Sequence, residues 1–183
     1  MDHQSSRTYS IISRVISDEI AIMAILGIVV GLAGGFGAIG FRYLIDFCQS
    51  ISYGSAGELL DVVSTIPWYF RIGIPALGGL VVGPIVYFLA REAKGHGVPE
   101  VMEAVALRSG LIRKRIVLIK TLASAVCIGT GGSVGREGPI VQIGSAIGSA
   151  IGQLLKVSAT RMRTLVGCGA AAGIAATFNA PIA

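Results

Sequence analysis

The sequence has few charged residues for a protein of its length. Asp, Glu, Lys and Arg make up 14% of its 183 residues, whereas about 25% is usual in a soluble domain. Hydrophobic residues make up 53% of the chain, and its mean hydropathy is +0.76. This composition excludes an ordinary soluble domain and indicates an integral membrane protein.

Aromatic residues are also scarce, at 7%, which bears on the meaning of the positive net charge of +5. The basic residues lie mostly in short clusters between apolar runs, with few aromatic side chains on which bases could stack. Such clusters are typical of the cytoplasmic loops of membrane proteins. We therefore expect a lipid bilayer around the chain and no nucleic-acid partner.

Cysteine is limited to Cys48, Cys127 and Cys168, which are odd in number and have no CxxC spacing. This pattern suggests neither a disulfide framework nor a zinc site, so we expect no metal and no other cofactor. Residues 1–19 are polar and mixed in charge, without the apolar core and cleavage site of a signal peptide. They are interpreted as a cytoplasmic N-terminal segment that precedes a membrane domain over residues 20–183.

Two apolar runs, residues 20–47 and 72–90, are long enough to cross a bilayer, which takes about 20 residues of helix. Ser17-Asp18-Glu19 precedes the first run and predicts its N-cap and first turn. Residues 91–115 carry a cluster of Lys and Arg, whereas the loop over residues 49–67 has none. The positive-inside rule then places the N-terminus and residues 91–115 in the cytoplasm, and we expect the plasma (inner) membrane.

The later apolar runs are shorter and predict a different arrangement. Residues 116–128 are too few to span a bilayer and lead to a glycine-rich segment, after which a second run covers residues 139–155. We expect a helical hairpin whose loop, residues 129–138, stops near the middle of the membrane, where it must be buried in protein or line a watery cavity. A last helix is predicted to start after Ser158. Because the sequence stops inside an apolar stretch, we expect the polypeptide to continue beyond Ala183.

Glycine recurs at four-residue spacing in three of these runs, which predicts close helix packing within or between subunits. We interpret these glycines as structural. The three seams are Gly27, Gly31 and Gly35; Gly144, Gly148 and Gly152; and Gly169 with Gly173.

Two glycine-containing segments break the helical pattern, Gly95-His96-Gly97-Val98-Pro99-Glu100 and Gly135-Arg136-Glu137-Gly138-Pro139. In each, glycine leads to a proline that suits the first turn of a helix. The first N–H groups of a helix lack partners within it, and the macrodipole adds roughly +0.5 of a charge there. Two such ends that converge would bind an anion without a full counter-charge and could release it again. Neither segment matches a nucleotide-binding motif.

The same segments resemble signatures of the ClC family of chloride channels and transporters. Gly135-Arg136-Glu137-Gly138-Pro139 is similar to the family's GREGP signature, the segment from Gly95 to Glu100 to its GSGIPE signature, and Phe178-Asn179-Ala180-Pro181 to a further family segment. The resemblance covers about residues 20–183. It implies an all-α, polytopic membrane fold with broken and re-entrant helices, of which this chain is the first part of an inverted repeat.

By this resemblance Glu137 is the gating glutamate, whose carboxylate occupies an anion site when ionised and swings away when protonated or displaced. An ionisable group inside a membrane is also a functional candidate on physical grounds, because placing it there costs at least ~2.5 kcal/mol. Two other roles are open to Glu137: an ion pair with Arg136, or an acid that stabilises the helix start. Arg136 is expected to brace the loop. The expected anion-binding residues are His96, Gly97, Val98, Pro99, Gly135, Arg136, Gly138 and Pro139.

His96 departs from the common family pattern, in which a serine hydroxyl contacts the central anion. Its imidazole N–H could replace that donor, or the side chain could turn away and leave the anion to backbone N–H groups such as those of Gly97 and Val98. A titrating histidine would make anion binding depend on pH near neutrality. A bystander histidine at a cytoplasmic vestibule is the alternative, so the sequence leaves the anion open: chloride or a related one.

The mode of transport is also open in the sequence. In the family, exchange of the anion for protons goes with a second, internal glutamate that would fall just beyond Ala183, so a passive channel and a proton-coupled exchanger are both compatible. The family further implies a homodimer with one pore per subunit. A third possibility is that the chain by itself is a membrane scaffold that does not transport.

An intramembrane hydrolase is a competing hypothesis. Gly131-Gly132-Ser133-Val134-Gly135 has the letters of a nucleophile elbow, with His96 as a candidate base. An elbow needs a strand before the serine, however, and the preceding run predicts a membrane helix, with no acid to orient the histidine. We therefore expect that the protein is not an enzyme.

Overall fold

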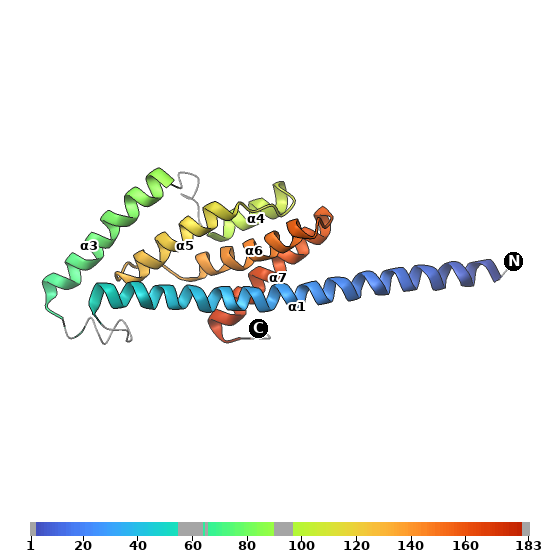
Figure 1. Ribbon diagram of the computed structural model, residues 1–183, viewed down its shortest axis with the longest axis horizontal. Coiled ribbons are helices and arrows are strands. Elements are labelled where there is room, and N and C mark those ends of the chain that lie inside the picture. Colours follow the sequence, from blue (N-terminus) through green and yellow to red (C-terminus); the bar gives the residue numbers. More distant parts are fainter. Residues whose placement is uncertain (1–2, 55–63, 65, 90–96, 181–183) are drawn as a thin grey trace.

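A computed structural model describes residues 3–54, 64, 66–89 and 97–180 of the chain. In these ranges the regular elements are all helical and no strand is present, which confirms the predicted all-α class. Figure 1 shows the four C-terminal helices stacked beside α1, whose N-terminal half projects beyond them. The elements are α1 (His3–Tyr53), α3 (Trp68–Pro84), the π-helix η1 (Ile85–Leu89), α4 (Gly97–Leu107), α5 (Lys114–Gly129), α6 (Glu137–Leu154) and α7 (Ala159–Phe178).

Helix α1 is continuous over 51 residues and begins earlier than predicted. Ser17-Asp18-Glu19 lies inside the helix, so the predicted N-cap there is wrong. Residues 3–26 contain neither Pro nor Gly to interrupt the helix, and the Glu19 carboxylate instead forms an ion pair with Arg161 of α7. Beyond the helix, Gly54 has a φ of 73°, which glycine adopts without strain, and the chain turns there.

Two helical stretches are long and apolar enough to cross a membrane, Glu19–Tyr53 and Trp68–Phe88. They overlap the two predicted crossings, although the second stretch starts already at Trp68. Only 11% and 6% of the most apolar part of each stretch is buried, unlike the core helices of a soluble protein. Large apolar side chains on both, such as Phe36 and Leu80, are exposed over 71% of their surface.

Helices α5 and α6 form the predicted hairpin, and α6 lies at the centre of the bundle in contact with α1, α4, α5 and α7. One buried cluster joins α1 to the hairpin through Ala38, Phe41, Ala125 and Ile140. A second cluster joins α4 and α7 to the other side of α6 through Val101, Val141 and Val166. Both clusters fix the direction of α6, and therefore the position of its N-terminus.

Glycines bring α6 and α7 into backbone contact, as predicted. Gly144 and Gly169 face each other so closely that a Cβ on either would overlap the carbonyl group of the other. Gly148 lies against the carbonyl oxygen of Leu165 in the same way, and a Cβ on Gly173 would lie 2.9 Å from the carbonyl oxygen of Ile140. Small residues at this interface let the two helices approach as they do in membrane proteins.

The predicted glycine seam of α1 faces the other described helices only in part: a Cβ on Gly27 would lie 3.7 Å from the Sγ of Cys168 in α7. A Cβ on Gly31 or Gly35 would have no neighbouring atom within 4 Å. Helix α1 packs through Gly34, whose Cβ would lie 3.3 Å from that of Ala172, and through Gly37. The sequence correctly indicated that glycines of α1 take part in helix packing, but their spacing alone does not show which of them face a neighbouring helix.

Helix α7 starts after Ser158, as predicted. The hydroxyl of Ser158 makes no capping hydrogen bond, and only its carbonyl oxygen is used, accepting from the N–H of Met162 at 2.9 Å. Asn179 follows the helix with a φ of 53° and ends it in the left-handed conformation that Asn tolerates. Pro181 of the third family segment lies outside the described residues.

Candidate functional site

The two segments expected to bind an anion meet in space at the starts of α4 and α6. A Cβ added to Gly97, the first residue of α4, would lie 2.5 Å from the carbonyl oxygen of Gly138 and 2.9 Å from its Cα. No side chain fits between them, so glycine is needed at position 97 for this close approach. The predicted convergence of two helix N-termini is thus present in the structure.

Both prolines lie in the first turns of their helices, as the sequence indicated. Pro99 is the third residue of α4 and Pro139 the third residue of α6. Pro lacks an N–H, and at this position a partner within the helix would be missing anyway. Pro139 is buried, whereas Pro99 and Val98 are exposed. His96 and Gly95 lie outside the described residues.

Glu137 is the first residue of α6, after Gly135 and Arg136, and all three residues are exposed. Its carboxylate folds back over Gly135 and occupies the space that a side chain at position 135 would need. Among the described residues it forms no ion pair with Arg136 and accepts no hydrogen bond. The carboxylate therefore stands unpaired at the positive end of the α6 dipole.

A polar brace fixes the two helix starts relative to each other. Glu100, in the first turn of α4, accepts hydrogen bonds from Lys120 of α5 at 2.9 Å and from Gln142 of α6 at 2.6 Å. The side chain of Lys120 is 14% exposed and that of Glu100 is 31% exposed, so the charges are paired in a largely desolvated place. One carboxylate oxygen thus links three helices about one turn from the Gly97–Gly138 contact.

This brace was not predicted from the sequence, although one signal for it was present. Lys120 is a charged residue in the middle of the apolar run over residues 116–128. A charge at such a place is expected to be paired and to matter for function. Its partner Glu100, however, lies 20 residues away, and the second donor to Glu100, Gln142, lies 42 residues from that carboxylate in the sequence, so no local periodicity identifies the group.

The glycine-rich loop between α5 and α6 is held by α1. The hydroxyl of Tyr53 donates to the carbonyl oxygen of Thr130 at 2.9 Å, and Gly131 turns the chain with a φ of 87°. Residues before Ser133 therefore form a helix and a turn, where a nucleophile elbow requires a strand. The hydrolase hypothesis loses its structural basis here.

Two exposed apolar helices, together with two further helices whose N-termini meet, define a class of protein: a membrane protein built with broken helices. Comparison with known families agrees with this class. Residues 78–183 match the family described as "Voltage gated chloride channel". The match covers more than half of the chain, and the chain belongs to this family.

Individual relatives point the same way. Over 88% of its length the chain is 36% identical to a protein of Ralstonia nicotianae named as chloride channel ClcB-like. Over 87% of its length it is 34% identical to the H(+)/Cl(-) exchange transporter ClcA of Citrobacter koseri. The crystal structure of a slow cyanobacterial Cl-/H+ antiporter superimposes on 86% of the chain with a TM-score of 0.68 and 27% identity.

These relatives are longer than the chain. It spans 38% of the Ralstonia protein, 33% of the Citrobacter protein and 37% of the antiporter chain. The match confirms the ClC-type membrane fold and an integral membrane protein.

Proposed function

We propose that the full-length protein carries chloride or a related anion across a membrane, with the junction of α4 and α6 as part of the anion site. The observation that carries this proposal is the contact between Gly97 and Gly138, which brings two helix N-termini together. Unpaired backbone N–H groups and two positive dipole ends then face one region. Relatives named as chloride channels and exchangers support chloride as the anion.

The charges around the junction support reversible binding. Lys120, a cation close to the helix starts, is paired with Glu100. An anion at the junction would therefore be held mainly by N–H groups and partial charges, which attract it without trapping it. We include in the site the residues at the two helix starts: Gly97, Val98, Pro99, Gly135, Arg136, Gly138 and Pro139, with His96 beside them in the chain.

Glu137 is proposed as the gate. Its ionised carboxylate competes with the transported anion for the N–H groups at the start of α6, because both are negative and both are attracted to the same helix end. Protonation removes that attraction and would free the site. The unpaired state of the carboxylate supports this role, since an ion pair with Arg136 would hold the side chain in place.

We propose proton-coupled exchange as the mode of transport; a passive channel, in line with the name of the Ralstonia relative, is the alternative. The Citrobacter relative is named as an H(+)/Cl(-) exchanger, and the similar solved structure is of a Cl-/H+ antiporter. A carboxylate that alternates between an anion site and a protonated state would couple the two ions. We further propose a homodimer in the plasma membrane with residues 1–19 in the cytoplasm, of which residues 3–19 belong to α1.

The proposal is tested by anion efflux from liposomes that contain the full-length protein, with and without a pH gradient. Glu137→Gln should retain or increase chloride efflux and abolish its dependence on pH, because the amide mimics a permanently protonated gate. Glu103→Gln is the control: Glu103 is exposed on α4 and pairs with Arg108, away from the junction. Efflux and pH dependence that are unchanged in Glu137→Gln would refute the gate, and absence of any anion flux in the wild type would refute transport.

A further inference from the structure

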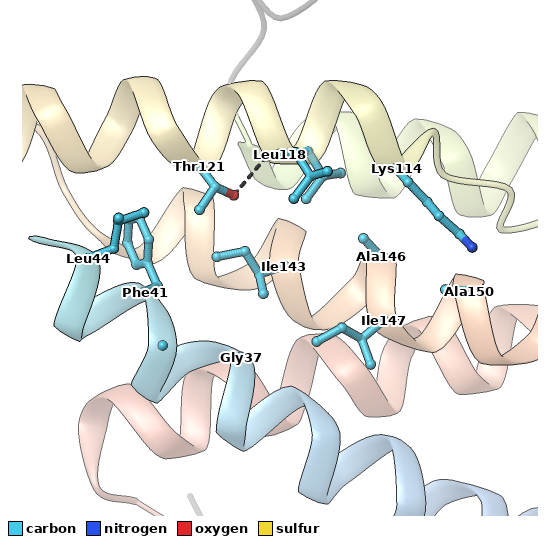
Figure 2. A pocket seen from close by; sticks show the side chains of 12 residues that line it. Gly37, Phe41, Leu44, Lys114, Leu118, Thr121, Ile143, Ala146, Ile147 and Ala150 are labelled. Atoms are coloured by element: carbon cyan, nitrogen blue, oxygen red, sulfur yellow. Dashed lines mark hydrogen bonds between the residues drawn. The ribbon is translucent and has the colours of Figure 1, made fainter.

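A groove on the outer face of the bundle lies between α1, α5 and α6, away from the Gly97–Gly138 junction. Its cavity volume is about 450 Å³, within the usual range for ligand pockets. Figure 2 shows it as a channel with apolar side chains on three sides. The residues that line it include Gly40, Phe41, Leu118, Ile143, Ile147 and Lys114.

The walls of the groove offer almost no hydrogen-bonding group. The hydroxyl of Thr121 donates to the carbonyl oxygen of Val117 at 2.7 Å, so it is already satisfied within α5. Gly40 leaves the wall of α1 open, since a Cβ there would have no atom within 4 Å. A ligand in this groove must therefore be an apolar chain.

One end of the groove is basic. Lys114, at the start of α5, is the charged residue among those that line the groove, and its ammonium group lies at one end in Figure 2. Arg115 follows it, and both residues are exposed. From Lys114 to Thr121 the helix rises about 10 Å. The groove thus has a cation at one end and is apolar over the rest of its length.

We propose that this groove binds a phospholipid with an anionic headgroup: the phosphate pairs with Lys114, and part of one acyl chain lies between α1, α5 and α6. The surface of α5 at the groove is apolar, since Leu118, which lines the groove, is 64% exposed and Leu122 is 52% exposed. Basic pockets between membrane helices at the cytoplasmic level commonly hold anionic lipid headgroups. The orientation also agrees with the positive-inside arrangement, which places the start of α5 at the cytoplasmic surface.

Native mass spectrometry of the full-length protein tests this proposal, with dioleoyl phosphatidylglycerol and dioleoyl phosphatidylcholine as probes. The two lipids share acyl chains and differ in net charge. Lys114→Gln should lower the affinity for phosphatidylglycerol about fivefold and leave phosphatidylcholine unchanged. Gly40→Leu fills the apolar part of the groove and should lower the affinity for both lipids. Gly40→Ala adds one methyl group in open space, so it should fold normally and show a smaller loss.

Matched controls separate the groove from the general surface. Lys156→Gln removes an exposed lysine that does not line the groove, and Gly35→Leu adds the same side chain to α1 at another open position. Both controls should bind the two lipids as the wild type does. The proposal is overturned if Lys114→Gln and Lys156→Gln behave alike, or if Gly40→Leu leaves lipid binding unchanged. It is also overturned if Gly40→Cys cross-links to a segment of the same protein, because a protein segment would then fill the groove.

Discussion

Lys120 donates to Glu100 at 2.9 Å and so ties the middle of α5 to the first turn of α4. Because Gln142 donates to the same carboxylate oxygen at 2.6 Å, the pair also fixes α6. The three side chains determine how the helices that form the Gly97–Gly138 contact are placed. The pair is therefore expected to act on transport through position rather than by binding the anion.

Replacing Lys120 with Met should destabilise the full-length protein by about 1.5–3 kcal/mol, because it leaves a largely desolvated carboxylate without its counter-charge. Anion efflux should fall as well, since the start of α4 loses its anchor. Thermal unfolding in detergent measures the first effect and liposome efflux the second. The double variant Glu100→Gln with Lys120→Met should recover part of the stability, because no unpaired charge is left.

The exposed pair of Arg108 and Glu103 serves as the comparison for this experiment. Its side chains are 53% and 49% exposed, and exposed ion pairs contribute only about 0–1 kcal/mol. Arg108→Gln should accordingly leave both stability and efflux near the wild-type values. If Lys120→Met were as mild as Arg108→Gln, the brace would have no structural role.

Gly97→Ala should separate the two helix starts. A methyl group at this position would lie 2.5 Å from the carbonyl oxygen of Gly138, and such overpacking typically costs about 1–3 kcal/mol. We expect chloride efflux to fall strongly while the protein still folds. Gly79→Ala is the control, because a Cβ on that residue of α3 would have no atom within 4 Å. Normal efflux in Gly97→Ala would show that the close contact is dispensable.

The sequence predicted those parts of the site that depend on local chemistry. Pro99 and Pro139 occupy first turns because proline suits that position wherever the helix lies. The start of α7 after Ser158 and the hairpin of α5 and α6 follow from the lengths of apolar runs and their polar interruptions in the same way. The meeting of the two helix starts was expected from what such ends do in transport proteins.

The sequence could not predict features that depend on which helices become neighbours. The start of α1 was misplaced because Glu19 looked like a first-turn acid, whereas its partner is Arg161, 142 residues away. Gly31 and Gly35 have the spacing of a packing seam, but α1 turns a different face to the bundle. Lys120 and Glu100 are paired for the same reason: tertiary packing brings together residues whose local patterns are unrelated.

Gly169→Ala should disrupt the contact between α6 and α7. The added methyl group would overlap the carbonyl group of Gly144, so we expect a loss of about 1–3 kcal/mol or more in stability. Gly167→Ala, two residues earlier on the same helix, meets no atom within 4 Å. It should be neutral or more stable, since Ala favours a helix by about 0.5–1 kcal/mol over Gly. Melting temperatures of the two variants in detergent make the comparison, and equal values would contradict the seam.

Ser149 of α6 holds the turn between α4 and α5 by two hydrogen bonds, so replacing it should lower the stability of the protein. Its buried hydroxyl donates to the carbonyl oxygen of Gly110 at 2.7 Å and accepts from the N–H of Ile112 at 3.0 Å. Ser149→Ala would leave both backbone groups unpaired, at about 1–3 kcal/mol for each group that stays buried. Ser145, one turn earlier and equally buried, has a hydroxyl without a partner among the described residues. Ser145→Ala should therefore leave the melting temperature unchanged or raise it. If both variants lowered the melting temperature equally, the two hydrogen bonds of Ser149 would not stabilise the protein.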